Sequence, residues 1–388
     1  MARMTISDWA SPAFLADPYP FYRDLRENDP VHFDESREVW MLMRYTDISE
    51  VLHDDVRFSA ELGPSNSMLV TDPPEHTRLR GLVNKAFTAK TVQGLRPRIE
   101  EIVGGLLDAV EGRSGMDVIA EFAYPLPITV IAEMLGVEPA QRDFFRRVSE
   151  QVAFSLGPAA DPHAGDRANE GRTELVHYFE ELIAKRRAEP RDDLVSALIR
   201  AEEEGDLLSH SELLAMLVLL LIGGHETTVN LIANGLLALL RNPDQLDLFS
   251  RQEGSERQAV EELLRYDSPV QYTGRVVTRD VEMRGKRIRA GDRVRLILAS
   301  ANRDEEIFEG GERLDITRDP CLHLSFGIGT HFCLGAQLAR LEGAIALAAL
   351  VRRFPNLRLT GQELAWRPAP VLRGLEALPV ALDGGGPG

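Results

Sequence analysis

The chain has 388 residues and a formal net charge of −17, so it is strongly acidic and long enough to bury a large core. A nucleic-acid-binding protein usually carries the opposite charge or a basic block, and the sequence has neither. The two cysteines, Cys321 and Cys333, are too few for a disulfide framework or a multi-thiolate metal cluster, and they fit a reducing cytosol. The first residues contain no apolar signal core, and the longest apolar run, residues 213–222, is too short to span a bilayer. We therefore expect a cytoplasmic protein without a membrane anchor.

Helical and strand-like patterns are unevenly distributed along the chain. Two alternating strands are expected within residues 31–43. The pattern is then overwhelmingly helical over residues 46–265, and β-like segments return over 275–298 and 375–382. No linker-like or repeated segment divides the sequence. These features predict one mainly α domain with a minor β component.

A glycine-rich segment surrounds one of the cysteines. Residues 326–335 read Phe-Gly-Ile-Gly-Thr-His-Phe-Cys-Leu-Gly, and helical apolar spacing continues from there to Pro355. Clustered glycines indicate a backbone path that side chains would block. Cys333 would lie at the N-terminus of this helix, where unpaired N–H groups and the helix dipole stabilise a thiolate. One thiolate suits a single axial position on a metal, and the alternative is a glycine-rich turn around a structural cysteine.

The segment resembles the heme-ligand loop of the cytochrome P-450 monooxygenases, Phe-Gly-x-Gly-x-His-x-Cys-x-Gly, at every fixed position. The resemblance implies that Cys333 is the axial ligand of the heme iron and that Phe326, Gly327 and Gly335 shape the loop around it. It covers nearly all of residues 1–388, with four motifs in the order of the family. The chain is similar to the soluble bacterial members. This implies a single-domain, helix-rich triangular prism with a long central helix across heme b (iron protoporphyrin IX).

A long helix is predicted near the middle of the chain. Ser209 and Glu212 form a capping-box pattern, and the apolar spacing continues to Asn242, which gives a length of about 50 Å at about 1.5 Å per residue. Glycines interrupt its centre, and a threonine can hydrogen-bond to the carbonyl four residues earlier and open the turn. The residues at this centre are Gly223, Gly224, Glu226 and Thr227.

In the family, the matching Gly-Gly-x-Glu-Thr pattern lies beside the oxygen-binding face of the heme. The resemblance implies that Glu226 and Thr227 deliver protons to bound dioxygen, because an acid and an alcohol together can relay protons. A thiolate ligand would supply electron density from the opposite side of the iron. The alternative is a buried Glu–Thr pair that only satisfies a helix kink. His225 is expected at the variable position of the pattern, facing away from the heme.

A third pattern, Glu-x-x-Arg, places Glu262 and Arg265 on one helix face. This spacing occurs by chance in many helices, so it carries meaning only beside the other motifs. The resemblance implies a buried pair that locks the core beneath the cysteine loop, with Arg313 as the third member. Gly311 and Leu314 replace a proline and a phenylalanine of the family around this arginine, which suggests a looser segment.

Four basic side chains are implied as partners of the heme propionates. His76 and Arg80 are spaced i, i+4 on one expected helix, Arg275 begins a strand, and His331 lies in the cysteine loop. Two carboxylates buried with a porphyrin require charge-assisted donors. Each residue alone could be an ordinary surface cation, and the indication comes from all four matching the positions of the family.

The expected substrate contacts are mostly apolar, as is usual for small-molecule pockets. Gln271 would supply one polar anchor, or it could instead hydrogen-bond to backbone. Residues 60–70 and 157–165 are expected to be lid segments that gate access. By their positions within the matched motifs, the contacts are Leu219, Ile222, Gln271, Val371 and Leu372.

The resemblance implies a heme-dependent monooxygenase, an oxidoreductase that hydroxylates or epoxidises a mostly apolar small molecule of natural-product, steroid, terpenoid or fatty-acid type. No flavin- or nicotinamide-binding pattern follows Leu298. Electrons from NAD(P)H would therefore come through a separate ferredoxin or flavodoxin and its reductase, docking behind Cys333 near Arg78 or Arg340. A monomer is expected.

Two other functions remain open. A peroxygenase would use hydrogen peroxide directly, but it would have less need of the Glu226–Thr227 pair. A heme protein without catalytic activity, such as a gas or ligand sensor, could keep Cys333, but the acid–alcohol pair would then be unexplained.

Overall fold

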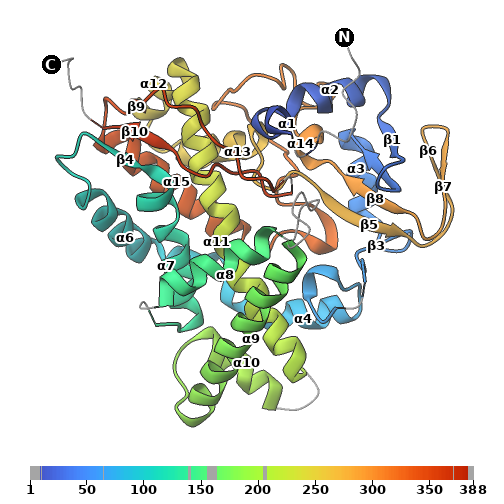
Figure 1. Cartoon of the computed structure of the whole chain (residues 1–388), viewed down its shortest axis with the longest axis horizontal. Helices are drawn as coiled ribbons and strands as arrows, with labels where there is room; N and C mark the ends of the chain where they lie inside the picture. Colours follow the sequence, from blue (N-terminus) through green and yellow to red (C-terminus); the bar gives the residue numbers. More distant parts are fainter. Residues whose placement is uncertain are drawn as a thin grey trace.

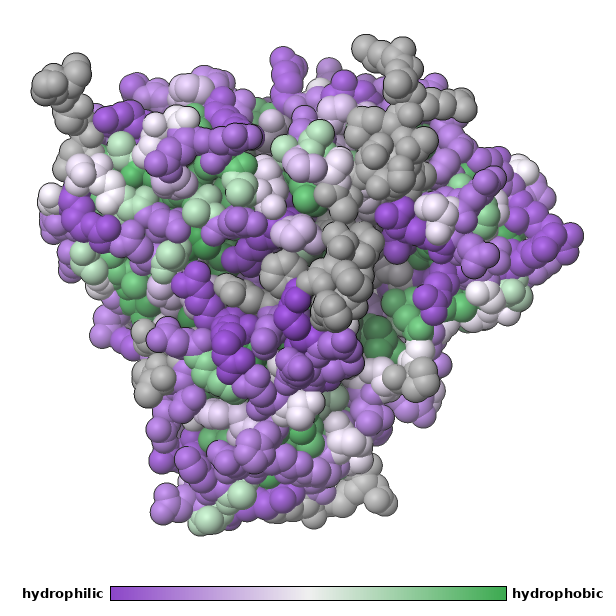
Figure 2. Space-filling view, in the orientation of Figure 1, coloured by the Kyte–Doolittle hydropathy of each residue, from purple (hydrophilic) through white to green (hydrophobic). Residues whose placement is uncertain are grey.

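The computed structural model describes residue 9 and residues 11–63, 65–138, 141–154, 164–203, 208–369 and 371–382. Figure 1 shows one long helix, α11, running through the middle of the molecule, with helices on one side and the larger sheet on the other. The face in Figure 2 is mostly hydrophilic, with hydrophobic residues in small separate patches, as expected for a strongly charged chain.

Helices make up most of the described chain, which confirms the mainly α prediction. In order, the α-helices are α1 (Pro12–Ala16), α2 (Tyr19–Asn28), α3 (Tyr45–His53), α4 (Glu75–Asn84), α5 (Ala89–Gly94), α6 (Arg96–Asp108), α7 (Pro125–Leu135), α8 (Arg142–Phe154), α9 (Ala164–Ala188), α10 (Leu194–Glu203), α11 (His210–Arg241), α12 (Pro243–Arg251), α13 (Glu256–Tyr266), α14 (Leu298–Ala301) and α15 (Ala336–Arg353). Single turns of 3-10 helix occur at η2 (Met68–Val70), η3 (Lys85–Phe87) and η6 (Gly329–His331), and η4 (Ile119–Ala123) is a π-helical turn.

The larger sheet has the strand order β1-β2-β8-β5-β3, and within it only β2 and β8 pair in parallel. A second sheet has the order β4-β10-β9, and β6 and β7 form a hairpin. The strands are β1 (Val31–Asp34), β2 (Val39–Leu42), β3 (Phe58–Ser59), β4 (Gly115–Asp117), β5 (Thr273–Val277), β6 (Val281–Met283), β7 (Lys286–Ile288), β8 (Arg293–Leu296), β9 (Arg358–Leu359) and β10 (Pro379–Ala381).

Two of these strands lie within residues 46–265, the range that the sequence predicts to be overwhelmingly helical. Strands β3 and β4 lie inside that range and have two and three residues. A strand so short shows no alternating pattern in the sequence, so only its pairing partners, β5 and β10, define it.

The predicted capping box begins α11. The Ser209 N–H donates to Glu212 Oε2 (2.7 Å), and the Glu212 N–H donates back to Ser209 Oγ (3.3 Å). Further along, α11 approaches α7 closely, since a Cβ on Gly224 would lie 2.9 Å from Ile131 Cγ1. Helix α11 is long and apolar enough to cross a membrane, but 67% of its most apolar window is buried inside the protein, as in a core helix.

A hairpin near the C-terminus connects the two ends of the described chain. Its arms are residues 365–369 and 371–376, and we refer to it as the C-terminal hairpin. Arg373 donates to the Ala16 carbonyl (2.9 Å) and to Asp267 Oδ1 (2.7 Å). This buried arginine therefore holds the hairpin against α1 and the end of α13.

Candidate active site

The loop that carries Cys333 is closed by a hydrogen bond from the Cys333 N–H to the Phe326 carbonyl (2.8 Å). Gly327 and Gly329 have φ values of +64° and +72°, a left-handed conformation that favours glycine. A Cβ on Gly329 would also collide with the Leu52 carbonyl oxygen. Backbone shape thus requires glycine at 327 and 329, as the clustered pattern predicts, and contact with α3 adds a second reason at 329. Gly335 has a φ of −81° and open space around it, so nothing in the structure requires glycine there.

Cys333 lies three residues before α15 begins, which agrees with the expected helix N-terminus. The backbone N–H groups of Gly335 and Ala336 point at its sulfur. Burial raises the pKa of the Cys333 thiol, and these N–H groups and the charges of Arg80 and Arg340 counteract part of that rise. Yet the residue also has an exposed surface. Both observations are explained if the side chain is surrounded by protein but borders an open interior space.

Helix α11 has an open face over its first half. Residues with exposed or half-buried surface recur every three to four positions, whereas residues 228–239 are buried on every side. A Cβ on Gly223 would meet nothing within 4 Å. The Thr227 hydroxyl donates to the Gly223 carbonyl (3.0 Å), which is the hydrogen bond that the sequence predicts. We call this surface the open stripe; it contains Ala215, Leu219, Ile222, Gly223 and Thr227.

Glu226 is buried beside the open stripe and is paired with an arginine that the sequence reasoning missed. Arg367 Nη1, in the C-terminal hairpin, donates to Glu226 Oε2 (3.0 Å). No local pattern could have identified Arg367, because 141 positions separate the partners. Burial raises the pKa of Glu226, but His225 and Arg367 lower it by more, so it lies below its ordinary value. The acid is therefore ionised at neutral pH.

His225 is fully buried and faces away from the open stripe, as expected for the variable position. Its Nδ1 lies 2.7 Å from the Leu221 carbonyl oxygen, and its ring meets Tyr124 edge to face at 5.8 Å.

The four basic side chains come together as the resemblance implies. The rings of His76 and His331 are 4.3 Å apart, and Arg275 is buried. Burial and nearby positive charge lower the pKa of both histidines, that of His331 to about 4. His76 Nδ1, His331 Nε2 and Arg275 Nε lack hydrogen-bond partners among the described residues. Burial lowers the pKa of Arg80, which lies close enough to Cys333 to interact with its charge. An anion with two carboxylates would satisfy this group.

These features fit a heme. Unpartnered basic side chains are suited to two propionates, and the Cys333 thiol keeps exposed surface at the start of α15. Among the residues that the structure describes, no group of three or more His, Cys, Asp or Glu side chains is placed to hold a bare metal ion. The donor set therefore suits a metal that arrives inside a prosthetic group with one protein thiolate as ligand.

The Glu262–Arg265 pair is completely buried, with Nε and Oε2 2.6 Å apart. The structure corrects the third member. Arg313 contributes its carbonyl oxygen, which accepts from Arg265 Nη2 (2.9 Å), while its exposed side chain remains in solvent. The second ion pair to Glu262 comes from Arg318 Nε at 3.1 Å. The positive φ of Gly310 starts a turn that directs the backbone of this segment, and not the Arg313 guanidinium, toward the pair.

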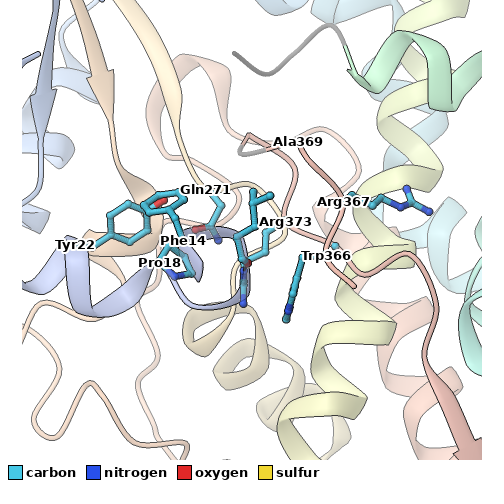
Figure 3. Close-up of a pocket in the computed structure, with 10 residues that line it drawn as sticks. Phe14, Pro18, Tyr22, Gln271, Trp366, Arg367, Ala369 and Arg373 are labelled. Carbon is cyan, nitrogen blue, oxygen red and sulfur yellow. Dashed lines mark hydrogen bonds between the residues drawn. The ribbon is translucent and has the colours of Figure 1, made fainter. Parts of the chain in front are cut away.

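The expected substrate residues divide into two groups. Leu219 and Ile222 lie on the open stripe. Gln271 is buried against the N-terminal aromatic side chains, where it lines a small pocket with Phe14 and Tyr22 (Figure 3). Its side chain donates to the Ser268 carbonyl (2.7 Å), so the backbone-bonding alternative is the one observed.

The other two expected contacts lie in the C-terminal hairpin. Val371 packs against the N-terminal aromatic cluster, and Leu372 forms a β-bridge with Val270.

The expected lid and docking residues are only partly accounted for. The segment over residues 60–70 ends in the η2 turn, and most of 157–165 lies outside the described residues. Arg78 pairs with Glu212, and Arg340 pairs with Glu261 (2.5 Å). Redox docking by these arginines stays a prediction.

Comparison with known proteins agrees with this site. Residues 156–247 and 257–363 match the family model described as Cytochrome P450. The chain is 46% identical over 396 residues to Cytochrome P450 107B1 of Saccharopolyspora erythraea, covering 95% of this chain and 96% of the relative. The chain belongs to the cytochrome P450 family.

Further relatives agree with this cytochrome P450 assignment. The chain is 42% identical over 394 residues to the Vitamin D(3) 25-hydroxylase of Pseudonocardia autotrophica, covering 97% of this chain and 96% of the relative. The crystal structure of CYP109E1 from Bacillus megaterium in complex with testosterone has a TM-score of 0.92 and 36% identity, covering 96% of this chain and 100% of that one. The P450 fold and the bacterial class predicted from the sequence are confirmed. The protein is an oxidoreductase that binds heme b and receives electrons from NAD(P)H through redox partners.

Proposed function

We propose that the protein is a heme-thiolate monooxygenase in which Cys333 is the axial ligand and one oxygen atom of O2 is inserted into a mostly apolar small molecule. The observation that carries the proposal is the Cys333 thiol itself. It lies just before the start of α15, accepts from two backbone N–H groups and keeps exposed surface. When bound, the heme supplies the activation of dioxygen and the oxidising power for the reaction.

His76, Arg80, Arg275 and His331 would bind the two propionates. Their unpartnered donors supply charge-assisted hydrogen bonds in a buried place, where an unpaired carboxylate would be costly. Donors from α4, β5 and the cysteine loop would thus hold the cofactor from three separate segments of the chain. Phe326, Gly327 and Gly335 would shape the loop beneath it.

Glu226 and Thr227 would deliver protons to the oxygen side. Thr227 lies on the open stripe, and because its hydroxyl donates to the Gly223 carbonyl, its oxygen lone pairs are free to accept a hydrogen bond from water. Glu226 is ionised and can accept a proton from water that enters the site and pass it to the hydroxyl. Gly223 and Gly224 leave room for this exchange.

The substrate would be a steroid-sized, mostly apolar molecule. Leu219 and Ile222 give the open stripe an apolar surface, and Val371 and Leu372 lie on the adjoining C-terminal hairpin. Two relatives also support this size, one named for vitamin D(3) and one crystallised with testosterone. Hydroxylation is the reaction favoured by the relative's name. Testosterone and vitamin D(3) are therefore the first molecules to test for the absorbance shift that follows when substrate displaces water from ferric heme.

We propose that residues 1–388 act as one domain, in a cytoplasmic monomer. The contacts of Arg373 with Ala16 and Asp267 support a single domain, because they join the C-terminal hairpin to α1 and to the end of α13. A ferredoxin or flavodoxin with its reductase would supply the electrons.

The ligand assignment is tested by Cys333→Ala. The reduced carbon monoxide complex of this variant is expected to lose the thiolate-type spectrum, because the only proposed sulfur ligand is gone. Cys321→Ala is the matched control, since Cys321 lies beside Glu262 and not at the loop. An unchanged spectrum in Cys333→Ala, or its loss in Cys321→Ala, would overturn the assignment.

The reaction class is tested by turnover of testosterone and vitamin D(3) under three conditions: with a ferredoxin system, with hydrogen peroxide, and with neither. Product that requires the ferredoxin system supports the monooxygenase. Efficient turnover with peroxide alone would instead identify a peroxygenase, and binding without product under any condition would favour a sensor.

A further inference from the structure

Helix α11 carries a row of polar residues inside an otherwise apolar core. Glu226, Asn230 and Asn234 follow one another at intervals of four, which places them on one face of the helix. All three are at most 2% exposed. Buried polar side chains usually have hydrogen-bond partners, and one segment of the chain contacts all three of these.

The partner of this row is the C-terminal hairpin. Asn234 Nδ2 donates to the Arg373 carbonyl (3.0 Å). A Cβ on Gly374 would collide with Asn230 Oδ1, so the hairpin backbone lies directly on the helix. Arg367 Nη1 completes the row by donating to Glu226 Oε2 (3.0 Å). Figure 3 shows the Arg367 side chain turned away from the other labelled pocket residues and toward α11.

The two oxygens of Glu226 differ in their surroundings. Oε2 accepts from Arg367, whereas Oε1 has no hydrogen-bond partner and faces His225 Nε2 at 3.5 Å. Because the Leu221 carbonyl can only accept, His225 Nδ1 must carry a hydrogen to make its 2.7 Å contact. The 3.5 Å separation of His225 Nε2 from Glu226 Oε1 is longer than an ordinary hydrogen bond, and neither atom has a hydrogen-bond partner. Arg367 is therefore the hydrogen-bond donor that holds Glu226 in the described structure.

We propose that Arg367 is a positioning residue for Glu226, which it holds as a carboxylate with one oxygen fixed and the other free to exchange a proton. The inference rests on the proposed function, in which Glu226 delivers protons. It adds that the C-terminal hairpin, which also carries Val371 and Leu372, is tied through this ion pair to the proton-delivering acid. A movement of the hairpin on substrate binding would therefore change the ion pair that holds Glu226.

The surroundings of Glu226 contain few other groups that could account for its ionisation. His225 is the titratable neighbour on α11, and Arg367 is the charged group on the hairpin. Beyond His225 lies Tyr124, with the Arg146 guanidinium 5.0 Å above its ring. From α7, the side chain against Gly224 is the apolar Ile131.

The chain offers a matched control for this ion pair. Arg373 is a second buried arginine of the same hairpin and pairs with Asp267 (2.7 Å), but it does not touch Glu226. Arg367→Gln and Arg373→Gln should both loosen the hairpin, and only Arg367→Gln should change the acid. Arg367→Lys keeps the positive charge and tests for rescue.

The deciding measurement is infrared difference spectroscopy of the carboxyl band as a function of pH, with Glu226→Gln to assign the band. In Arg367→Gln the Glu226 carboxyl is expected to titrate at least one pH unit higher than in the unsubstituted protein, which is at least a tenfold change in its ionisation constant. Arg367→Lys should restore at least half of that shift, and Arg373→Gln should leave the titration unchanged.

The proposal would be overturned if the Glu226 titration did not shift in Arg367→Gln, or if it shifted equally in Arg373→Gln. It would also be overturned if His225→Gln shifted this titration and Arg367→Gln did not. If Arg367→Gln does not fold, Arg367→Lys is the deciding variant. A smaller upward shift of the Glu226 titration is expected in Arg367→Lys, whereas a purely structural role for Arg367 would give no shift. The reduced carbon monoxide spectrum, recorded on the same samples, separates the two hypotheses. If the unsubstituted protein does not show the thiolate-type spectrum, the proposed function is contradicted, but the titration result on Arg367 still stands.

Discussion

Thr227 contributes a hydroxyl group to the open stripe of α11. Its hydroxyl hydrogen is directed to the Gly223 carbonyl (3.0 Å), so the side chain has one defined orientation in which the oxygen faces the interior space. A hydroxyl held in this way can accept a hydrogen bond from a water molecule and so hold that water in place. Its neighbour Glu226 is ionised, so it must first take up a proton from water before it can pass one on.

Replacing Thr227 by alanine should therefore divert reducing equivalents to peroxide. We expect product formed per NAD(P)H consumed to fall by about tenfold, a modest loss for one positioned proton-transfer group. Thr227→Ser keeps a hydroxyl and should recover most of the coupling. The measurement is the ratio of peroxide to hydroxylated product with testosterone or vitamin D(3), and coupling in Thr227→Ala equal to the unsubstituted enzyme would contradict the role.

At the scale of elements, α11 places two adjacent glycines in opposite environments. Gly223 faces open space, and a Cβ there would meet nothing within 4 Å. Gly224 faces α7, where a Cβ would lie 2.9 Å from Ile131 Cγ1. The first glycine keeps the interior space open, and the second allows two helices to pack closely.

The two glycines should respond differently to the same substitution. In the heme-free protein, Gly223→Ala should raise the free energy of unfolding by about 1 kcal/mol, because alanine favours the helix and nothing opposes it. Gly224→Ala should lower it by about 1 kcal/mol, since overpacking against Ile131 outweighs that gain. Urea unfolding followed by tryptophan fluorescence measures the free energy of unfolding of both variants. Equal free energies of unfolding for Gly223→Ala and Gly224→Ala would contradict the assignment of the two faces.

At the scale of the whole molecule, Glu261 joins three segments around the cysteine loop. From α13 it contacts Arg340 of α15 (2.5 Å) and His323 in the segment that leads into the loop (3.0 Å). Burial raises the pKa of Glu261, but His323 and Arg340 lower it to about 2. A carboxyl with a depressed pKa in the folded state stabilises the fold above its unfolded pKa, and this contribution disappears as the pH falls through the folded value.

Acid should therefore remove most of what Glu261 contributes. At pH 7, Glu261→Gln should have a free energy of unfolding about 2–3 kcal/mol below that of the unsubstituted protein, and the difference should shrink between about pH 5 and pH 2. The control is Glu256→Gln, which breaks an ion pair between Glu256 and Arg352 (2.6 Å) that joins the same two helices. The Arg352 side chain is about one-third exposed, so this pair is more open to solvent. Its effect should be smaller. A Glu261→Gln difference that does not change with pH would contradict the argument.

The sequence by itself determined the family and the fold class, and it supplied the candidates for the residues that carry the chemistry. The cysteine loop, the capping box of α11 and the Thr227–Gly223 bond depend on neighbours within a few positions. Backbone conformation and helical spacing settle such features locally. Four motifs of this kind in one order were enough to predict the position of α15 and the open turn of α11.

Only the tertiary structure decided which distant side chains meet. The Glu226–Arg367 pair spans 141 positions, the second ion pair of Glu262 goes to Arg318 and not to Arg313, and Gln271 turns toward the N-terminal aromatic cluster. Each outcome depends on the direction in which a turn or hairpin presents its side chains, as at Gly310 and Gly374. That direction follows from how whole elements pack, and no local spacing of residues encodes it.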